Sequence, residues 1–183
     1  MVIEMFDQAS FVLYYCCMLS VPFYHQKKPY TCGPAVMRMV FRYFGHVYDE
    51  IELERRLKAE PLLGTRHRYL IRIARRNGFY SYVNHGSNLA ELKYFLSLEL
   101  PPIVRLSARL GSDKDEGHYA VVTAVTKRHI YLNDPWRGAD FQISVKSFLR
   151  EWRDNETGKT YERWMMVLSP KKISIGRIYI QGT

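Results

Sequence analysis

Residues 26–45 read QKKPYTCGPAVMRMVFRYFG, and the other predicted elements are expected to pack around this segment. After Cys32, apolar residues recur at a 3.6-residue spacing and share one face of a predicted helix: Ala35, Val36, Met39, Val40, Tyr43 and Phe44. Pro34 fits the first helical turn, where its missing N–H group would have had no partner, and Gly45 can take the left-handed conformation that ends a helix. The pattern predicts a helix with a buried stripe that begins at Cys32, with Arg38 and Arg42 pointing away from the core.

The predicted position of Cys32 favours a reactive thiol. Unpaired backbone N–H groups and the positive end of the helix dipole stabilise a thiolate at a helix N-terminus. Such surroundings lower the pKa of a cysteine to roughly 3.5–7.5. Gln26 lies six residues upstream, at a spacing that lets its side-chain amide and the Cys32 backbone N–H group point at the same oxyanion.

A cysteine nucleophile also needs a base and a group that orients the base. Residues 117–136, GHYAVVTAVTKRHIYLNDPW, contain two β-rich runs on either side of a short polar turn, which predicts an antiparallel hairpin. His118 begins the first strand and Asp134 ends the second, so both are expected at the same end of the ladder. Asp134 is predicted to hold the His118 ring through its Nδ1–H group and to stabilise the imidazolium.

Three segments together resemble the double-glycine leader peptidases, which are papain-like domains fused to bacterial peptide-exporting ABC transporters, and their standalone relatives. The segments are VPFYHQKKPYTCGPAVMRMVFRYFG (21–45), GHYAVVTAV (117–125) and YLNDPW (131–136), and the resemblance covers about residues 20–145. It implies a papain-like cysteine peptidase fold and a peptide or protein substrate. It also implies that Gln26 is the oxyanion residue, Cys32 the nucleophile, His118 the base and Asp134 the orienting group.

The sequence favours a cysteine peptidase or amide hydrolase, because all four polar parts of the site are present. Two alternatives stay open: a catalytically silent domain that binds a peptide or another anionic partner, and acyl transfer to an amine. Trp136 is predicted to form a wall of the substrate site or to pack in the core. Gly117 and Gly33 are further candidates for substrate contact.

Local patterns predict helices first and strands after, which indicates an α+β fold with an N-terminal helical half packed on a C-terminal antiparallel sheet. A capping box at residues 49–52 is expected to start a second helix, which ends before Pro61. Further helices are predicted at 66–77, 89–98 and 145–152, and strands at 79–83, 103–106, 119–126, 129–133, 141–144, 163–168 and 173–180. Residues 11–19 are predicted to form a strand or a short helix, and 108–117 a mobile flap beside the site.

Length and composition predict one domain over residues 1–183, with the motifs in about 20–145 and residues 146–183 completing the sheet. The content of 47% hydrophobic residues is that of a folded protein. Three cysteines, with Cys16 and Cys17 adjacent, do not suit a disulfide framework and favour a reducing, cytoplasmic compartment. No transmembrane segment, metal or cofactor is expected, because the longest apolar run is short and no histidine has metal-ligand spacing.

The formal net charge of +9 favours anionic partners. Arg68, Arg72, Arg75 and Arg76 lie at helical spacing with no acidic residue among them. This face is interpreted as solvated or, alternatively, as a site for an acidic peptide, a membrane surface or a nucleic acid. A nucleic-acid module is the least favoured, because the aromatic residues lack the pattern of an RNA-binding motif.

Overall fold

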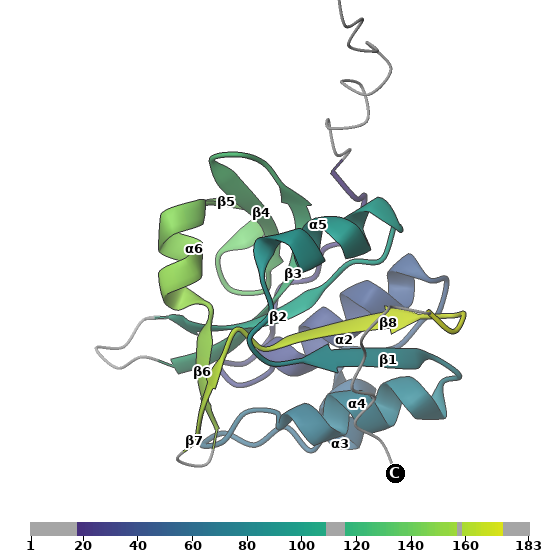
Figure 1. Ribbon diagram of the computed structural model, residues 1–183. Coiled ribbons are helices and arrows are strands. Elements are labelled where there is room, and N and C mark those ends of the chain that lie inside the picture. Colours follow the sequence, from purple (N-terminus) through teal and green to yellow (C-terminus); the bar gives the residue numbers. More distant parts are fainter. Residues whose placement is uncertain (1–17, 109–115, 157–158, 174–183) are drawn as a thin grey trace, which may run out of the picture.

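The structure is a computed structural model that describes residues 18–108, 116–156 and 159–173. A six-stranded antiparallel sheet runs through its centre in the order β1-β8-β2-β3-β4-β5 (Figure 1). The strands are β1 (Tyr80–Asn84), β2 (Ile103–Ala108), β3 (Glu116–Val125), β4 (His129–Asp134), β5 (Gly138–Ser144) and β8 (Met165–Ser169). A separate hairpin is formed by β6 (Arg153–Glu156) and β7 (Lys159–Glu162).

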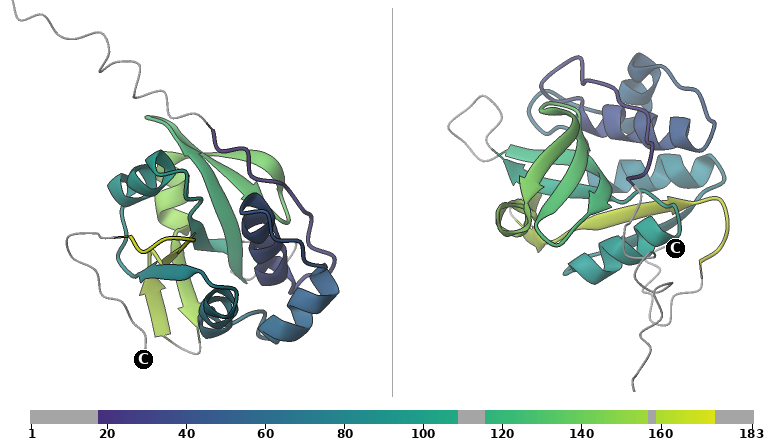
Figure 2. Two further views of the ribbon diagram at one scale, coloured as in Figure 1. Left: turned by 90° about the vertical axis from the view of Figure 1, so that its right-hand side faces the viewer. Right: turned by 90° about the horizontal axis from the view of Figure 1, so that it is seen from above.

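Helices cover both faces of the sheet (Figure 2). One face packs against α2 (Cys32–Tyr43), α3 (Glu50–Leu57) and α4 (His67–Arg76), and the other against α5 (Leu89–Ser97) and α6 (Val145–Glu151). Neighbouring strand residues alternate between the two core clusters, as Ile103 and Val104 do in β2. The α+β fold class is therefore confirmed, with α5 and α6 on the face of the sheet opposite α2.

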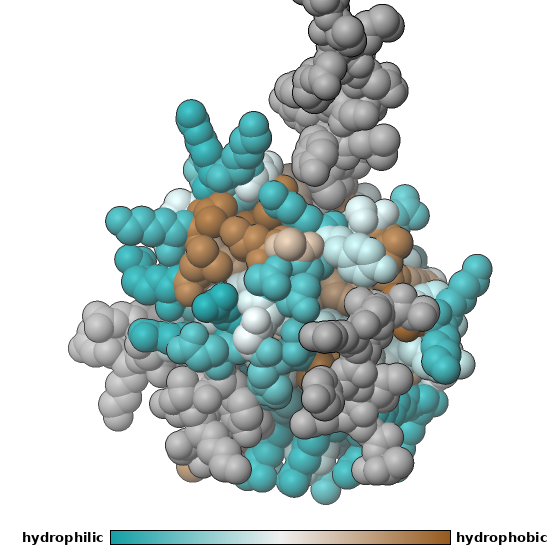
Figure 3. Space-filling view, viewed as in Figure 1, coloured by the Kyte–Doolittle hydropathy of each residue, from teal (hydrophilic) through white to brown (hydrophobic). Residues whose placement is uncertain are grey.

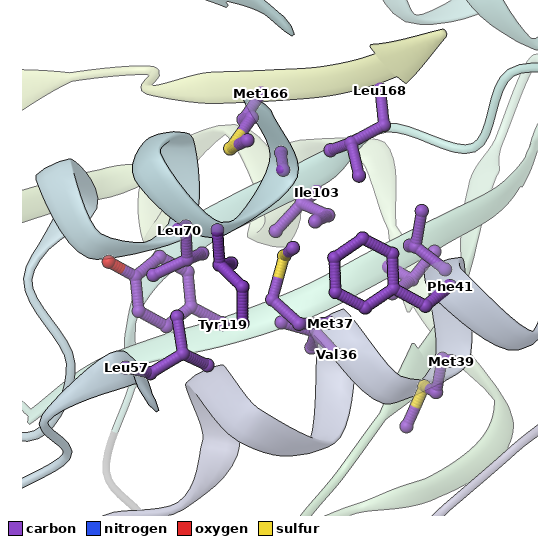
Figure 4. Packing of buried hydrophobic residues seen from close by; sticks show 14 of the residues in the cluster. Val36, Met37, Met39, Phe41, Leu57, Leu70, Ile103, Tyr119, Met166 and Leu168 are labelled. Atoms are coloured by element: carbon purple, nitrogen blue, oxygen red, sulfur yellow. The ribbon is translucent and has the colours of Figure 1, made fainter. Parts of the chain in front are cut away.

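The helix α2 lies deeper than a single apolar stripe predicts. Nine of its twelve residues are buried, and Met37 and Phe41 pack with Tyr119 of β3 (Figure 4). Arg38, predicted to point into solvent, is instead half-buried, with its guanidinium 3.8 Å from the Tyr24 ring centroid. The segment before α2 thus covers the side of the helix that the sequence pattern leaves polar.

The predicted helices and strands that lie in the described ranges are present, with ends that differ by a few residues. The β3–β4 hairpin is among them, and its turn is closed by backbone and side-chain bonds between Thr126 and His129. The capping box is wrong at residues 49–52, where Asp49 accepts only from the Glu50 N–H group; a complete one forms at Asn88 and Glu91. The predictions for residues 11–17, 109–115 and 174–180 lie outside the described residues.

Figure 3 shows apolar side chains gathered on one part of the face that α5 and α6 cover. Leu149 of α6 is 41% exposed, whereas its neighbour Phe148 is buried in the core.

In the described ranges, no helix is both long enough and apolar enough to span a bilayer.

Asn133, the residue before Asp134, fastens the segment that precedes α2 to the sheet. Its buried Nδ2 donates to the carbonyl of Val21 at 2.7 Å, and its Oδ1 accepts from the Asp140 N–H group at 3.3 Å. We expect Asn133→Ala to lower the free energy of unfolding by about 1–3 kcal/mol, because the buried Val21 carbonyl loses its donor. Urea unfolding measures the change, with the exposed Gln142→Ala on β5 as control. Equal losses in the two variants would contradict this role.

Candidate active site

Three distant segments bring Cys32, His118 and Asp134 together. Cys32 is the first residue of α2, His118 lies near the start of β3, and Asp134 ends β4. The His118 Nε2 and Asp134 Oδ1 atoms are 2.7 Å apart, and the Cys32 thiol lies close enough to the His118 ring for each group to shift the pKa of the other. All three side chains are buried, and Cys32 is only 4% exposed. The thiol, imidazole and carboxyl groups therefore form one buried cluster.

The orientation of the imidazole differs from the prediction. His118 presents Nε2 to Asp134, not Nδ1. Asp134 ends β4 just after a register shift in its pairing with β5. Nδ1 is therefore the ring nitrogen left for Cys32.

The electrostatics of the pair favour the ionised forms. Burial raises the pKa of Cys32, but the hydrogen bond and positive charge of His118, the Tyr119 backbone N–H group and the charge of Arg105 lower it further than burial raises it. Burial lowers the pKa of His118, yet its bonds to Asp134 and Cys32 raise it to about 9. At neutral pH the arrangement therefore stabilises a thiolate beside an imidazolium.

Asp134 is held as an anion by several donors. Burial raises the pKa of its carboxyl group, but His118 and the backbone N–H groups of Arg137 and Trp136 lower it more strongly. Both N–H groups donate to Oδ1 at 2.9 Å. Arg137 also bonds Glu151 at 3.1 and 3.2 Å, which links the turn after β4 to α6. These contacts fix the carboxylate that orients His118.

Gln26 reaches the site because residues 19–26 run along the sheet. The Leu19 N–H group donates to the carbonyl of Thr123 at 3.0 Å, and the Gln26 N–H group donates to that of Pro135 at 3.1 Å. The backbone of Gln26 is thus bonded to the residue that follows Asp134.

The Gln26 side chain is not directed as the oxyanion prediction requires. Its Nε2 donates to the carbonyls of Lys28 and Pro29 at 2.8 and 2.9 Å, while its Oε1 is buried and has no partner within the described residues. Carbonyl oxygens only accept, so the amide nitrogen must face them. Both N–H groups of the amide are therefore occupied in this state, and its oxyanion role stays a prediction.

Glu50 supports the same loop and is not apparent from the sequence. Its side chain is buried, and Oε1 accepts from the Lys27 N–H group at 2.9 Å and contacts Thr31 Oγ1 at 3.0 Å. A glutamate in the first turn of a helix is normally predicted to be exposed to solvent. The only available hint was that the loop before Cys32 has N–H and hydroxyl donors that need an acceptor. Glu50 positions the backbone that leads into Cys32.

Arg105 is a second residue that sequence reasoning missed. It lies on β2 opposite Tyr119, where its guanidinium is 4.7 Å from the Tyr119 ring centroid and donates to the Thr65 carbonyl at 3.3 Å. Its charge favours the Cys32 thiolate and, after burial, is the next cause that lowers the pKa of His67 to about 2. An arginine in a strand is normally predicted to lie at the surface, so no sequence pattern indicated that Arg105 is buried.

The predicted substrate contacts have different surroundings. A Cβ atom on Gly33 would lie 2.6 Å from the Thr65 side chain, and one on Gly117 would overlap the Arg105 guanidinium, so packing alone explains both glycines. Trp136 is 44% exposed, which excludes a core role for it. Contact of these residues with substrate stays a prediction.

Among the residues described, no group of three or more His, Cys, Asp or Glu side chains could hold a metal ion.

Solved structures share this architecture. A double glycine motif protease from an AMS/PCAT transporter, solved with its leader peptide, has a TM-score of 0.64 at 18% identity over 84% of this chain and 94% of its own. The peptidase domain of Streptococcus ComA, a bifunctional ABC transporter, has 0.63 at 22% over 81% and 97%. A protein described as a C39-like peptidase from Bacillus anthracis has 0.65 at 15% over 85% and 98%. At these identities the likeness concerns the fold.

The sequence itself carries a more specific match. No curated protein matches the chain. The model of the peptidase C39 family, however, matches residues 20–156, which include the nucleophile helix and the β3–β4 hairpin. Because this match spans most of the chain and agrees with the fold, the chain belongs to the peptidase C39 family.

Proposed function

We propose that the protein is a cysteine peptidase of the double-glycine type that cleaves a peptide bond with Cys32, His118 and Asp134. Membership of the C39 family supports a double-glycine peptidase-like function. The observation that carries the proposal is the buried cluster in which His118 bonds Asp134 and lies beside the Cys32 thiol, whose pKa it lowers. A peptide is the expected substrate, since the transporter protease that resembles this chain was solved with a leader peptide.

The proposed reaction begins with attack of the Cys32 thiolate on the carbonyl carbon of the scissile bond. The backbone N–H group of Cys32, which has no partner within the helix, stabilises the oxyanion that forms. His118 then donates its proton to the leaving amine, and the C–N bond breaks to leave a thioester. A water molecule, deprotonated by His118, attacks the thioester, releases the acid and restores the thiolate.

A silent peptide-binding domain is the second candidate function. The observation that favours it is the Gln26 amide, whose two N–H groups are bonded to carbonyls of its own loop. In a peptidase, one of these bonds must break when the oxyanion forms. Turnover of a peptide separates the two candidates, because both would bind one.

The pH dependence of Cys32 alkylation tests the coupled pair. Because the Cys32 pKa is lowered and that of His118 is raised, iodoacetamide should label Cys32 well below the pH at which an ordinary thiol of pKa about 8.5 loses reactivity. His118→Ala should move the onset of labelling to higher pH, and Asp134→Ala should move it less, because Asp134 acts through the ring. Peptide cleavage should decline as the pH rises through about 9, where His118 loses its proton.

Mass spectrometry can follow labelling at Cys16, Cys17 and Cys32 separately. His129→Ala, which removes a histidine at the other end of the β3–β4 hairpin, is the matched control and should leave the onset unchanged. An ordinary thiol onset in the wild type, unaltered by His118→Ala, would refute the catalytic pair.

A further inference from the structure

We propose that the turn between α3 and α4, together with the basic surface beside it, docks on an anionic lipid bilayer. The surface, called the docking corner below, consists of Lys58, Leu62, Leu63, Arg68 and Arg72. The turn belongs to the lower edge of the molecule, where α3 and α4 run (Figure 1).

Two leucines protrude from the docking corner. Leu62 is 96% exposed and Leu63 is 50% exposed. They lie in a closed turn, because Glu60 and Gly64 exchange backbone hydrogen bonds of 3.0 and 2.8 Å beneath them. An ordered turn that exposes apolar side chains to water is suited to binding a partner with an apolar region, such as the acyl chains of a bilayer.

Three cations surround one aromatic ring beside this turn. The charged groups of Lys58, Arg68 and Arg72 lie 5.7, 4.8 and 5.5 Å from the centroid of the Tyr69 ring. Within the described ranges, none of the three forms an ion pair with a carboxylate. The hydrogen bond from Arg68 is the main cause of a lowered pKa of Tyr69, and the charges of Arg68 and Lys58 contribute to it. In this part of the described structure, the three cations therefore form a positive surface without ion pairs.

The combination favours a bilayer over a nucleic acid. Basic side chains near a membrane surface are attracted to anionic headgroups, and adjacent apolar side chains gain by entering the acyl region. A phosphate backbone would use the same cations but would leave both leucines in water. The net charge of +9 adds long-range attraction to either partner and so does not decide between them.

The docking corner is connected to the candidate active site. Thr65, next to Gly64, accepts hydrogen bonds from Tyr119 Oη at 3.0 Å and from Arg105 Nη1 at 3.3 Å, and its side chain lies against Gly33. Docking would hold the nucleophile helix close to the bilayer surface and favour peptides presented there. The membrane interaction itself does not depend on peptidase activity.

Cosedimentation with vesicles tests the proposal. We expect binding to vesicles of equal parts phosphatidylglycerol and phosphatidylcholine, much weaker binding to phosphatidylcholine alone, and release at high salt. The variant Arg68→Gln/Arg72→Gln should weaken binding by about 25-fold, at roughly fivefold for each cation lost. The variant Leu62→Ser/Leu63→Ser should weaken it at least about tenfold.

Two matched controls distinguish docking from general attraction. Lys127→Gln/Arg128→Gln removes the same charge from the exposed β3–β4 turn, and Leu149→Ser removes an exposed leucine from α6. Neither should change binding by more than about twofold, whereas alkylation of Cys32 should be the same in all variants. Equal losses of binding in the test and control variants would overturn the proposal. It would also be overturned if Leu62→Ser/Leu63→Ser bound the vesicles as tightly as the wild type. Retained affinity of the leucine variant for poly(U) RNA, without vesicle binding by the wild type, would favour a nucleic acid instead.

Discussion

Cys32→Ala is expected to reduce the rate of peptide cleavage by about 10⁴- to 10⁶-fold while the chain stays folded. The thiolate is the only group of the site placed to form a covalent bond with substrate, so its removal leaves binding but no nucleophile. A double-glycine peptide substrate with a C-terminal fluorophore measures the rate. Cys32→Ser keeps nearly the same volume in the buried site and guards against a packing defect; it should be almost as inactive. Residual cleavage within tenfold of the wild type would refute the assignment.

The same variant has a second readout at His118. Loss of the thiol removes one of the bonds that raise the pKa of His118 to about 9, so its titration should move to lower pH in an NMR experiment. A raised pKa means that the folded state binds the proton more tightly than the unfolded chain. The stability that this adds is complete below about pH 6.5 and is lost as the pH rises through about 9. In Cys32→Ala the stability lost between these pH values should be smaller than in the wild type. A general destabilisation would lower stability at every pH and would not change this difference.

Gln26→Ala is expected to reduce turnover by about 100- to 1000-fold, the usual effect of losing one oxyanion donor. The structure adds a condition, because Nε2 donates to the carbonyls of Lys28 and Pro29. A developing oxyanion is a stronger acceptor than a neutral carbonyl, so one N–H group can turn to it when substrate is bound. The rate of cleavage per folded molecule and the pH onset of Cys32 alkylation are the two measurements; only the first should change.

Truncation of Gln26 also opens its own loop, at a cost of about 1 kcal/mol in stability for the lost hydrogen bonds. Lys27→Ala is the matched control, because its exposed side chain is removed while its backbone bond to Glu50 remains. If turnover falls no further in Gln26→Ala than in this control, the amide only fastens the loop and the silent binding domain gains support.

The nucleophile helix and the hairpin were predictable because their signals are local. A 3.6-residue apolar spacing after Cys32 and two β-rich runs around a polar turn each specify one element. The short hairpin of β6 and β7 was missed, since the polar sequences 153–156 and 159–162 alternate weakly and contain only one aromatic residue.

The parts of the site that could not be predicted depend on contacts between distant segments. Glu50 and Arg105 are charged residues of ordinary helix and strand positions, and each is buried by backbone groups far away in the sequence. The ring nitrogen that His118 presents to Asp134, Nε2, depends on how β3 and β4 place the two side chains against each other. Composition and spacing contain no information on such contacts. The order of the motifs along the chain was enough, however, to select Cys32, His118 and Asp134 as site residues.

The position of β8 has a consequence for how the chain is made. This late strand lies between β1 and β2, and in the described sheet it alone joins β1 to the other strands. Met166 and Leu168 complete the apolar cluster that encloses α2, so a nascent chain exposes that helix until β8 has been synthesised. Pairings of such long sequence separation close slowly and leave apolar surface open to aggregation meanwhile. The layer around Cys32 therefore closes only after β8, more than 130 residues later in the chain, has been synthesised.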